Sequence, residues 1–146
     1  FTGLRAALAL AEGLALGAGV PLIGVTTGEA LAAAVPASVR ARRVVWTVID
    51  NRRGEFVLER FAPGAAVPEG DPVVHAEAAL PRETRAVAVA GDAAPLVAAR
   101  LAARGVDALL CDSRLPDAVA AARVAALRLA GAIPPRAARP LYAEPP

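Results

Sequence analysis

The sequence predicts an α/β fold, and three stretches carry that prediction. Helix-like and strand-like segments alternate before residue 36, a strand-rich stretch follows from about residue 43, and a strand–helix–strand unit lies between 85 and 112. At 146 residues the chain is long enough to bury a core. Only 3% of its residues are aromatic while alanine is abundant, so we expect closely apposed helices rather than a bulky aromatic core.

The first part, residues 1–36, is predicted to be a helix, a strand and a helix. Residues 4–17 have helical spacing, "VPLIGVT" at 20–26 is typical of a buried strand, and "TGEALAAAV" at 27–35 predicts a helix that ends before Pro36. This order favours a parallel sheet. One strand and two helices cannot close a core alone, so either a partner supplies the rest or the chain is a fragment.

The second part, residues 38–146, begins with a predicted hairpin. The strand-like stretches "VVWTVI" and "EFVLERF" flank the polar loop "DNRRG", and a loop rich in proline and glycine at 62–72 should lie on the surface. Residues 85–112 then indicate a strand, a glycine turn, a helix and a second strand.

The last predicted helix runs from about Pro116 to Ala130. Proline would occupy its first position, Asp117 its first turn, and Gly131 would end it. A tail with five prolines follows, and we expect it to be extended.

Charge and cysteine content limit the function. All 16 basic residues are arginine and lie scattered along the chain, with Arg40, Arg42 and Arg43 as the one tight group. With a net charge of +2, this predicts no self-sufficient nucleic-acid binder. The single cysteine, Cys111, excludes an internal disulfide, favours a reducing compartment, and ends an apolar run where a buried thiol is expected.

The apolar stretch 4–25 is predicted not to cross a membrane. It contains Arg5 and Glu12 and is interrupted by several glycines and a proline. We therefore expect a soluble, cytoplasmic protein. Arg5 and Glu12 share one face of the first helix, and the rest of its circumference is apolar, which indicates that the helix is covered on two sides. The cover is either the core of a larger α/β domain or another polypeptide.

The stretch "FTGLRAALALAEGLALGAGVPLIGVTTGEALA" resembles the bacterial TsaB (YeaZ) family. That family has a Gly-Pro-Gly-Ser-Phe-Thr-Gly-Leu-Arg loop, then Ala-Lys-Gly-Leu-Ala, then a strand ending in Gly-Val-Ser, and Glu12 stands here where the family usually has lysine. The stretches "VIDNRRGEF", "AVAGDAA" and "ARPLYAEPP" are also similar to family motifs in order and spacing.

The resemblance implies the actin-like fold of sugar kinases, heat-shock ATPases and actin, with two lobes. In the family the first lobe begins with three strands, a helix and a fourth strand, and this sequence contains no counterpart of them. We therefore expect a truncated first lobe, with residues 1–36 as its remainder and residues 38–146 as the second lobe.

The resemblance also implies a function. TsaB is a non-catalytic scaffold that dimerises with a TsaD-type transferase, is joined by a TsaE-type ATPase, and supports threonylcarbamoylation of the adenosine next to the tRNA anticodon. Alone, it self-associates as a homodimer. The alternatives are a stand-alone glycoprotease-like peptidase, a degenerate actin-fold kinase, and a plain α/β ligand-binding domain.

No catalytic or metal-binding residue is expected in this chain. The paralogous transferase has a His-x-x-x-His metal pair, and Thr27 and Leu31 stand at the matching positions, where neither supplies an imidazole. The one histidine, His75, has no Cys or His neighbour in sequence, and no Ser–His–Asp set is indicated.

Weak phosphate-loop-like positions and a partner interface are the remaining candidates. No cofactor is assigned, and ATP is expected only in the complex. The phosphate-loop-like residues are Thr2, Gly3, Asp50, Gly54, Gly91 and Asp92. The expected interface residues on the first helix are Leu4, Ala7, Leu8, Ala11, Glu12 and Ala15, and Leu8→Glu is predicted to abolish both dimers.

Overall fold

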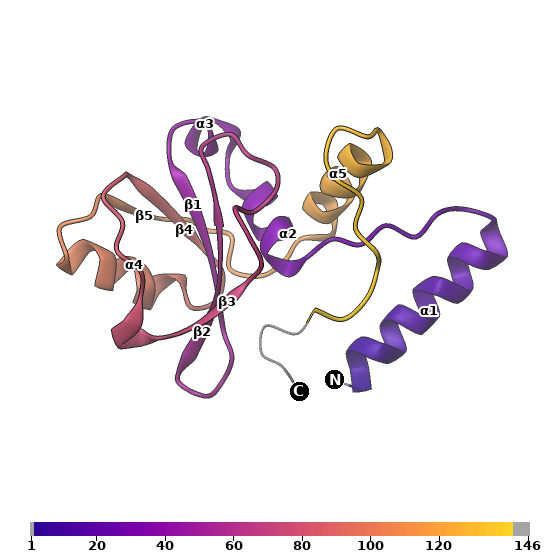
Figure 1. Ribbon diagram of the computed structural model, residues 1–146, viewed down its shortest axis with the longest axis horizontal. Coiled ribbons are helices and arrows are strands. Elements are labelled where there is room, and N and C mark those ends of the chain that lie inside the picture. Colours follow the sequence, from indigo (N-terminus) through magenta and orange to yellow (C-terminus); the bar gives the residue numbers. More distant parts are fainter. Residues whose placement is uncertain (1, 142–146) are drawn as a thin grey trace.

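A mixed five-stranded sheet organises the computed structural model, which describes residues 2–141 (Figure 1). Its strand order is β3-β2-β1-β4-β5, with β1 parallel to β4, β4 parallel to β5, and β2 antiparallel to both β1 and β3. The strands are β1 (Val44–Asp50), β2 (Glu55–Phe61), β3 (Val73–Ala76), β4 (Val87–Ala90) and β5 (Ala108–Leu110). The predicted α/β class, hairpin and strand–helix–strand unit are confirmed.

Alternation along β1 directs side chains to two faces, and a helix covers each face. Trp46 and Val48 join the cluster that packs under α4 (Ala94–Ala103), which is the helix between β4 and β5. Val45 joins the cluster on the other face with residues of α2 (Thr27–Ala34). The last helix, α5 (Ala118–Leu129), packs against α2. The result is a sheet sandwiched between helices.

The helix ends follow from capping groups. Thr26 and Glu29 form a reciprocal capping box at the start of α2, and that helix ends before Pro36, as predicted. A short helix, α3 (Ala37–Arg40), leads into β1. Gly131 follows α5 with a φ of +72°, as expected of a helix stop.

The predicted start of α5 was wrong by one or two residues. Asp117 precedes the helix instead of lying in its first turn, because its carboxylate accepts the backbone N–H groups of Val119 and Ala120. Such a cap lies outside the helix, so Pro116 is not helical.

Two strand predictions also need correction. Segment 20–26 was predicted to be a strand but forms none, since no other strand of residues 2–141 lies beside it. Its backbone is instead tied at Gly24, whose N–H donates to Arg136 O at 3.0 Å. Conversely, β3 was not predicted. It has only four residues and follows a glycine- and proline-rich loop, which is too short a stretch for an alternation of apolar and polar residues to be recognised. A 3₁₀ turn, η1 (Glu77–Ala79), follows it.

The first helix, α1 (Thr2–Ala18), has the predicted extent but not the predicted surroundings. None of its residues is buried, and Figure 1 shows it as an arm beside the sheet and its helices. Within residues 2–141 it is therefore not a core helix, and cover by another polypeptide stays a prediction. The division into residues 1–36 and 38–146 also stays a prediction. No helix within the described range is long and apolar enough to cross a membrane.

Candidate functional site

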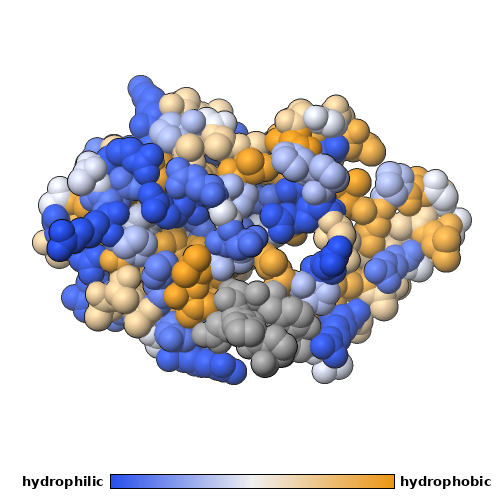
Figure 2. Space-filling model, in the orientation of Figure 1, coloured by the Kyte–Doolittle hydropathy of each residue, from blue (hydrophilic) through white to orange (hydrophobic). Residues whose placement is uncertain are grey.

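Among the described elements, α1 has the most exposed leucines. Leu10 and Leu14 are each 66% exposed and Leu16 is 85% exposed. Leucines 10 and 14 are one helical turn apart and share a face. Figure 2 shows apolar residues over the α1 arm at the right of the molecule. The sequence placed these leucines on the apolar circumference, but the expected interface did not include them.

The expected interface residues divide between two sides of α1. Leu8, Ala11 and Ala15 are half-buried and lie at helical spacing on the side toward the rest of the molecule, whereas Ala7 and Glu12 are exposed. Leu4 is 46% exposed and borders the same space as Leu8. Residues 2–141 thus cover the inner side of α1 only in part.

A wide hollow separates α1 from the sheet and the tail, and Figure 2 shows its opening. Its volume is about 1490 Å³. Apolar side chains form most of its wall, and Glu59, Thr26 and Arg136 are among its polar residues. Residues of α1 (Leu4, Arg5, Leu8) and of the β1–β2 hairpin (Ile49, Asn51, Arg53) border it from opposite sides.

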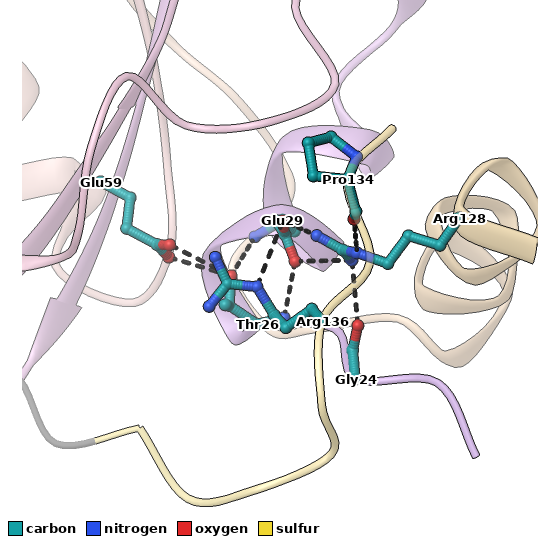
Figure 3. Close-up of polar contacts among 7 residues, drawn as sticks. All are labelled: Gly24, Thr26, Glu29, Glu59, Arg128, Pro134 and Arg136. Atoms are coloured by element: carbon teal, nitrogen blue, oxygen red, sulfur yellow. Dashed lines mark hydrogen bonds and ion pairs between the residues drawn. The ribbon is translucent and has the colours of Figure 1, made fainter. Parts of the chain in front are cut away.

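Glu59 of β2 is a nearly buried carboxylate at the edge of this hollow. Thr26 Oγ1 donates to its two carboxylate oxygens at 3.1 and 3.2 Å (Figure 3). A side chain at residue 28 would collide with it, because a Cβ on Gly28 would lie 1.6 Å from Glu59 Oε2. Burial raises the pKa of the Glu59 carboxyl above its usual value, against the opposing effect of the Thr26 hydroxyl.

Glu29 and Arg128 form a buried ion pair next to Glu59. The Arg128 guanidinium donates to both Glu29 carboxylate oxygens, and the side chains of Glu29 and Arg128 are 0% and 3% exposed, respectively. Arg128 also donates to Gly24 O and Pro134 O, each at 3.0 Å. Figure 3 shows that these residues come from α2, α5, segment 20–26 and the tail. Because Arg128 of α5 donates to α2, to segment 20–26 and to the tail, this cluster holds four segments together.

Three of the phosphate-loop-like residues meet at the ends of β1 and β4. The Asp50 N–H donates to Asp92 Oδ1 at 2.9 Å, and Arg52 Nη2 lies 3.8 Å from Asp92 Oδ2. Gly91 has a φ of +110°, and a Cβ there would lie 2.0 Å from Val48 O. The chain therefore needs glycine at this turn for backbone packing alone.

The other phosphate-loop-like residues lie elsewhere. Gly54 is in the β1–β2 turn with a φ of +79°, and Thr2 and Gly3 are in the first turn of α1. The first turn of α1 and the hairpin loop border the same hollow, through Leu4 and Asn51. Phosphate binding at these six positions stays a prediction.

Of the residues considered for metal binding, Thr27 and Leu31 lie one turn apart on α2, whereas His75 is on β3. His75 lies on β3 opposite Phe56, Thr27 is exposed, and Leu31 is in the core. The described range holds no group of three or more His, Cys, Asp or Glu side chains placed to bind a metal ion. Cys111 is buried, as predicted, and burial raises the pKa of its thiol.

No protein-family model and no curated protein matches this sequence. Solved structures do. A Pseudomonas aeruginosa protein described as similar to the peptidase YeaZ superposes with a TM-score of 0.75 at 22% identity, over 99% of this chain and 68% of its own. YeaZ from Pseudomonas aeruginosa superposes with a TM-score of 0.69, also at 22% identity, over 90% of this chain and 63% of its own.

The present chain thus spans about two thirds of the length of these structures. At such an identity the likeness establishes the fold alone. The described sheet and its covering helices agree with it. The chain therefore has the fold of these structures, a mixed α/β sheet with helices on both faces.

Proposed function

We propose that this chain is a non-catalytic scaffold subunit, which dimerises with a TsaD-type transferase and supports threonylcarbamoylation of the adenosine next to the tRNA anticodon. The fold of the YeaZ structures supports this role. The proposed setting is the cytoplasm. A TsaE-type ATPase joins the two subunits there, and the resulting complex binds ATP and acts on tRNA. Alone, the chain forms a homodimer.

The observation that carries the proposal is the exposure of α1. Full burial of a leucine side chain contributes about 1.5–3 kcal/mol, so a helix with leucines that are 66–85% exposed gains stability only when something covers it. The small residue Ala7 is exposed and lies at i, i+3 and i+7 spacing with Leu10 and Leu14 on one face of the helix, so it permits close approach of a second helix. A partner helix packed along α1 satisfies both features.

The test compares two charge-introducing variants. Leu10→Glu with Leu14→Glu is expected to weaken binding to a TsaD-type subunit by about 100-fold, since the proposal makes each of these exposed leucines a central apolar contact. The matched control is Leu115→Glu with Leu129→Glu, at positions 73% and 67% exposed outside α1. Sedimentation with and without the TsaD-type subunit measures association, and it also tests whether Leu8→Glu abolishes both dimers.

A reconstituted reaction completes the test. Purified chain, TsaD-type subunit, TsaE-type ATPase, tRNA, ATP and threonylcarbamoyl-adenylate are mixed, and one component is omitted at a time. Modification that needs both this chain and the TsaD-type subunit supports the scaffold role. Equal binding by the α1 variant and the control, or tRNA modification or protein cleavage by this chain alone, would overturn it.

A further inference from the structure

The sequence predicts no self-sufficient nucleic-acid binder because its arginines are scattered, but the fold brings several of these arginines together on one surface. The loops before β1, β4 and β5 all lie at one edge of the sheet, because these three strands are parallel. Arginine side chains join these loops. Arg43 Nη2 forms an ion pair with Asp107 Oδ2 at 2.9 Å, and Arg43 Nη1 donates to Asp107 O at 3.1 Å. Arg104 Nη1 donates to Leu80 O at 3.0 Å.

We call this edge the amino-edge surface. Its arginines are Arg40, Arg42, Arg43, Arg82, Arg85 and Arg104, and its carboxylates are Glu83 and Asp107. Arg60 and Glu69 lie next to Glu83 and add one charge of each sign. The surface therefore has a net charge of about +4, while the rest of the chain is negative, since the whole chain has a net charge of +2. Figure 2 shows many hydrophilic residues over this end of the sheet.

Much of this positive charge is available to an external anion. Arg42, Arg82, Arg85 and Arg104 are exposed, and within residues 2–141 Arg82 has no hydrogen bond or ion pair. Arg85 is the exception, because it pairs with Glu83, and its hydrogen bond lowers the Glu83 pKa to about 2. Guanidinium groups suit phosphate oxygens, to which they donate two parallel hydrogen bonds.

We propose that the amino-edge surface binds the phosphate backbone of an RNA stem. The aromatic residues Trp46, Phe56 and Phe61 are at most 5% exposed, so no described aromatic ring is available to stack on unpaired bases. A surface with exposed arginines but no exposed aromatic rings is suited to contact the phosphate backbone of a paired stem. The identification of this RNA as tRNA rests on the proposed function. The amino-edge surface is the part of this chain that contacts the tRNA in our proposal.

The test measures binding of fluorescently labelled tRNA to the full chain by anisotropy, across a series of salt concentrations. Arg42→Gln, Arg82→Gln and Arg104→Gln are combined in one variant, because these side chains are exposed and bond at most one backbone carbonyl. Loss of three phosphate contacts is expected to lower affinity by about 10-fold or more at low salt. It should also reduce the slope of log affinity against log salt by about 2 to 3.

The control variant carries the same change in charge at another place. Arg52→Gln, Arg53→Gln and Arg139→Gln lie in the hairpin loop and the tail, and β1 separates the hairpin loop from the amino edge by roughly 20–25 Å. This variant should retain its affinity for tRNA. An equal loss in both variants, or no binding of the unaltered chain at 50 mM salt, a typical low-salt condition, would overturn the proposal.

Pull-down with a TsaD-type subunit separates this inference from the proposed function. The amino-edge variant should still bind that subunit, because none of its substitutions is on α1. If the unaltered chain binds the subunit but not tRNA, the inference fails and the scaffold role stands. If it binds tRNA through this surface but not the subunit, the scaffold role fails and the RNA contact stands.

Discussion

Glu29 accepts hydrogen bonds from groups that are far apart in the sequence. The Thr26 N–H donates to its Oε2 at 2.8 Å, and Arg128 donates to both of its oxygens from α5. The side chains of Glu29 and Arg128 are 0% and 3% exposed. A buried charge that loses its partner is costly, so each of these two groups depends on the other.

Arg128→Met is therefore expected to lower the free energy of unfolding by about 3–5 kcal/mol, since it leaves the Glu29 carboxylate buried without its cation. Arg123→Met, on the exposed side of the same helix, should change it by no more than about 0.5 kcal/mol. Urea unfolding of both variants measures the difference. Equal effects at the two positions would show that the ion pair does not stabilise the fold.

Glu59 predicts a pH dependence of stability. Its pKa is raised in the folded state by burial, so the folded state holds the proton more tightly than the unfolded state does. The stability that this group contributes is complete below an unfolded pKa of about 4.3 and is lost as the pH rises through the folded pKa.

Glu59→Gln removes that dependence, because an amide does not titrate but still accepts the Thr26 hydroxyl. Relative to the unaltered protein, the variant should therefore gain stability between about pH 4 and pH 7. Urea midpoints at the two pH values measure the gain. Parallel stability curves for the two proteins would contradict the raised pKa.

At the scale of the elements, α1 differs from every other helix of eight or more residues in the described range. It has 17 residues but buries none, and it contains Gly13 and Gly17. An isolated helix of this length is only marginally stable in water, whereas α2, α4 and α5 each bury several residues. The free energy needed to unfold α1 locally should therefore be low.

Amide hydrogen exchange can measure this. In the chain without a partner, α1 amides should exchange at least about 100-fold faster than those of β1, which opens only by global unfolding. A bound TsaD-type subunit should slow exchange in α1 and leave β1 unchanged. Slow exchange in α1 of the isolated chain at low concentration would contradict its exposure.

The elements also show what the sequence predicted and what it did not. The spacing of apolar residues in the sequence located β1, β2, β4, α2 and α4 correctly. Each of these elements has local signals, such as the Thr26–Glu29 capping box at the start of α2. The strand predicted at 20–26 was wrong, since strand formation depends on a neighbour that sequence period does not reveal. The Glu29–Arg128 pair was missed for a similar reason, because 99 residues separate its members.

At the scale of the whole molecule, the tail holds the early part of the chain against the sheet domain. Gly24 is one point of contact: its N–H donates to Arg136 O at 3.0 Å, and Arg128 donates to its carbonyl. A Cβ at residue 24 would lie 2.4 Å from Ala137 O. Because that atom is backbone, the tail itself would have to move.

Gly24→Ala should accordingly loosen the tail, with strain of about 1–3 kcal/mol. Trypsin should then cut after Arg136 about tenfold faster, because the open form of the tail is more populated. Gly17→Ala is the matched control, since a Cβ there meets nothing within 4 Å. Mass spectrometry of the released peptide follows the rate, and equal rates in the two variants would rule out this contact as the tail's anchor.

The Glu29–Arg128 pair has a consequence for the protein during its synthesis. Residue 29 leaves the ribosome 99 residues before its cation does, which corresponds to about 5–20 s at typical elongation rates. Throughout that interval Glu29 can cap α2 but cannot be buried without the cost of an unpaired charge. We therefore expect α2 to dock onto the finished β1–β2 hairpin only after α5 has emerged, which leaves the apolar face of β1 and β2 uncovered during that interval.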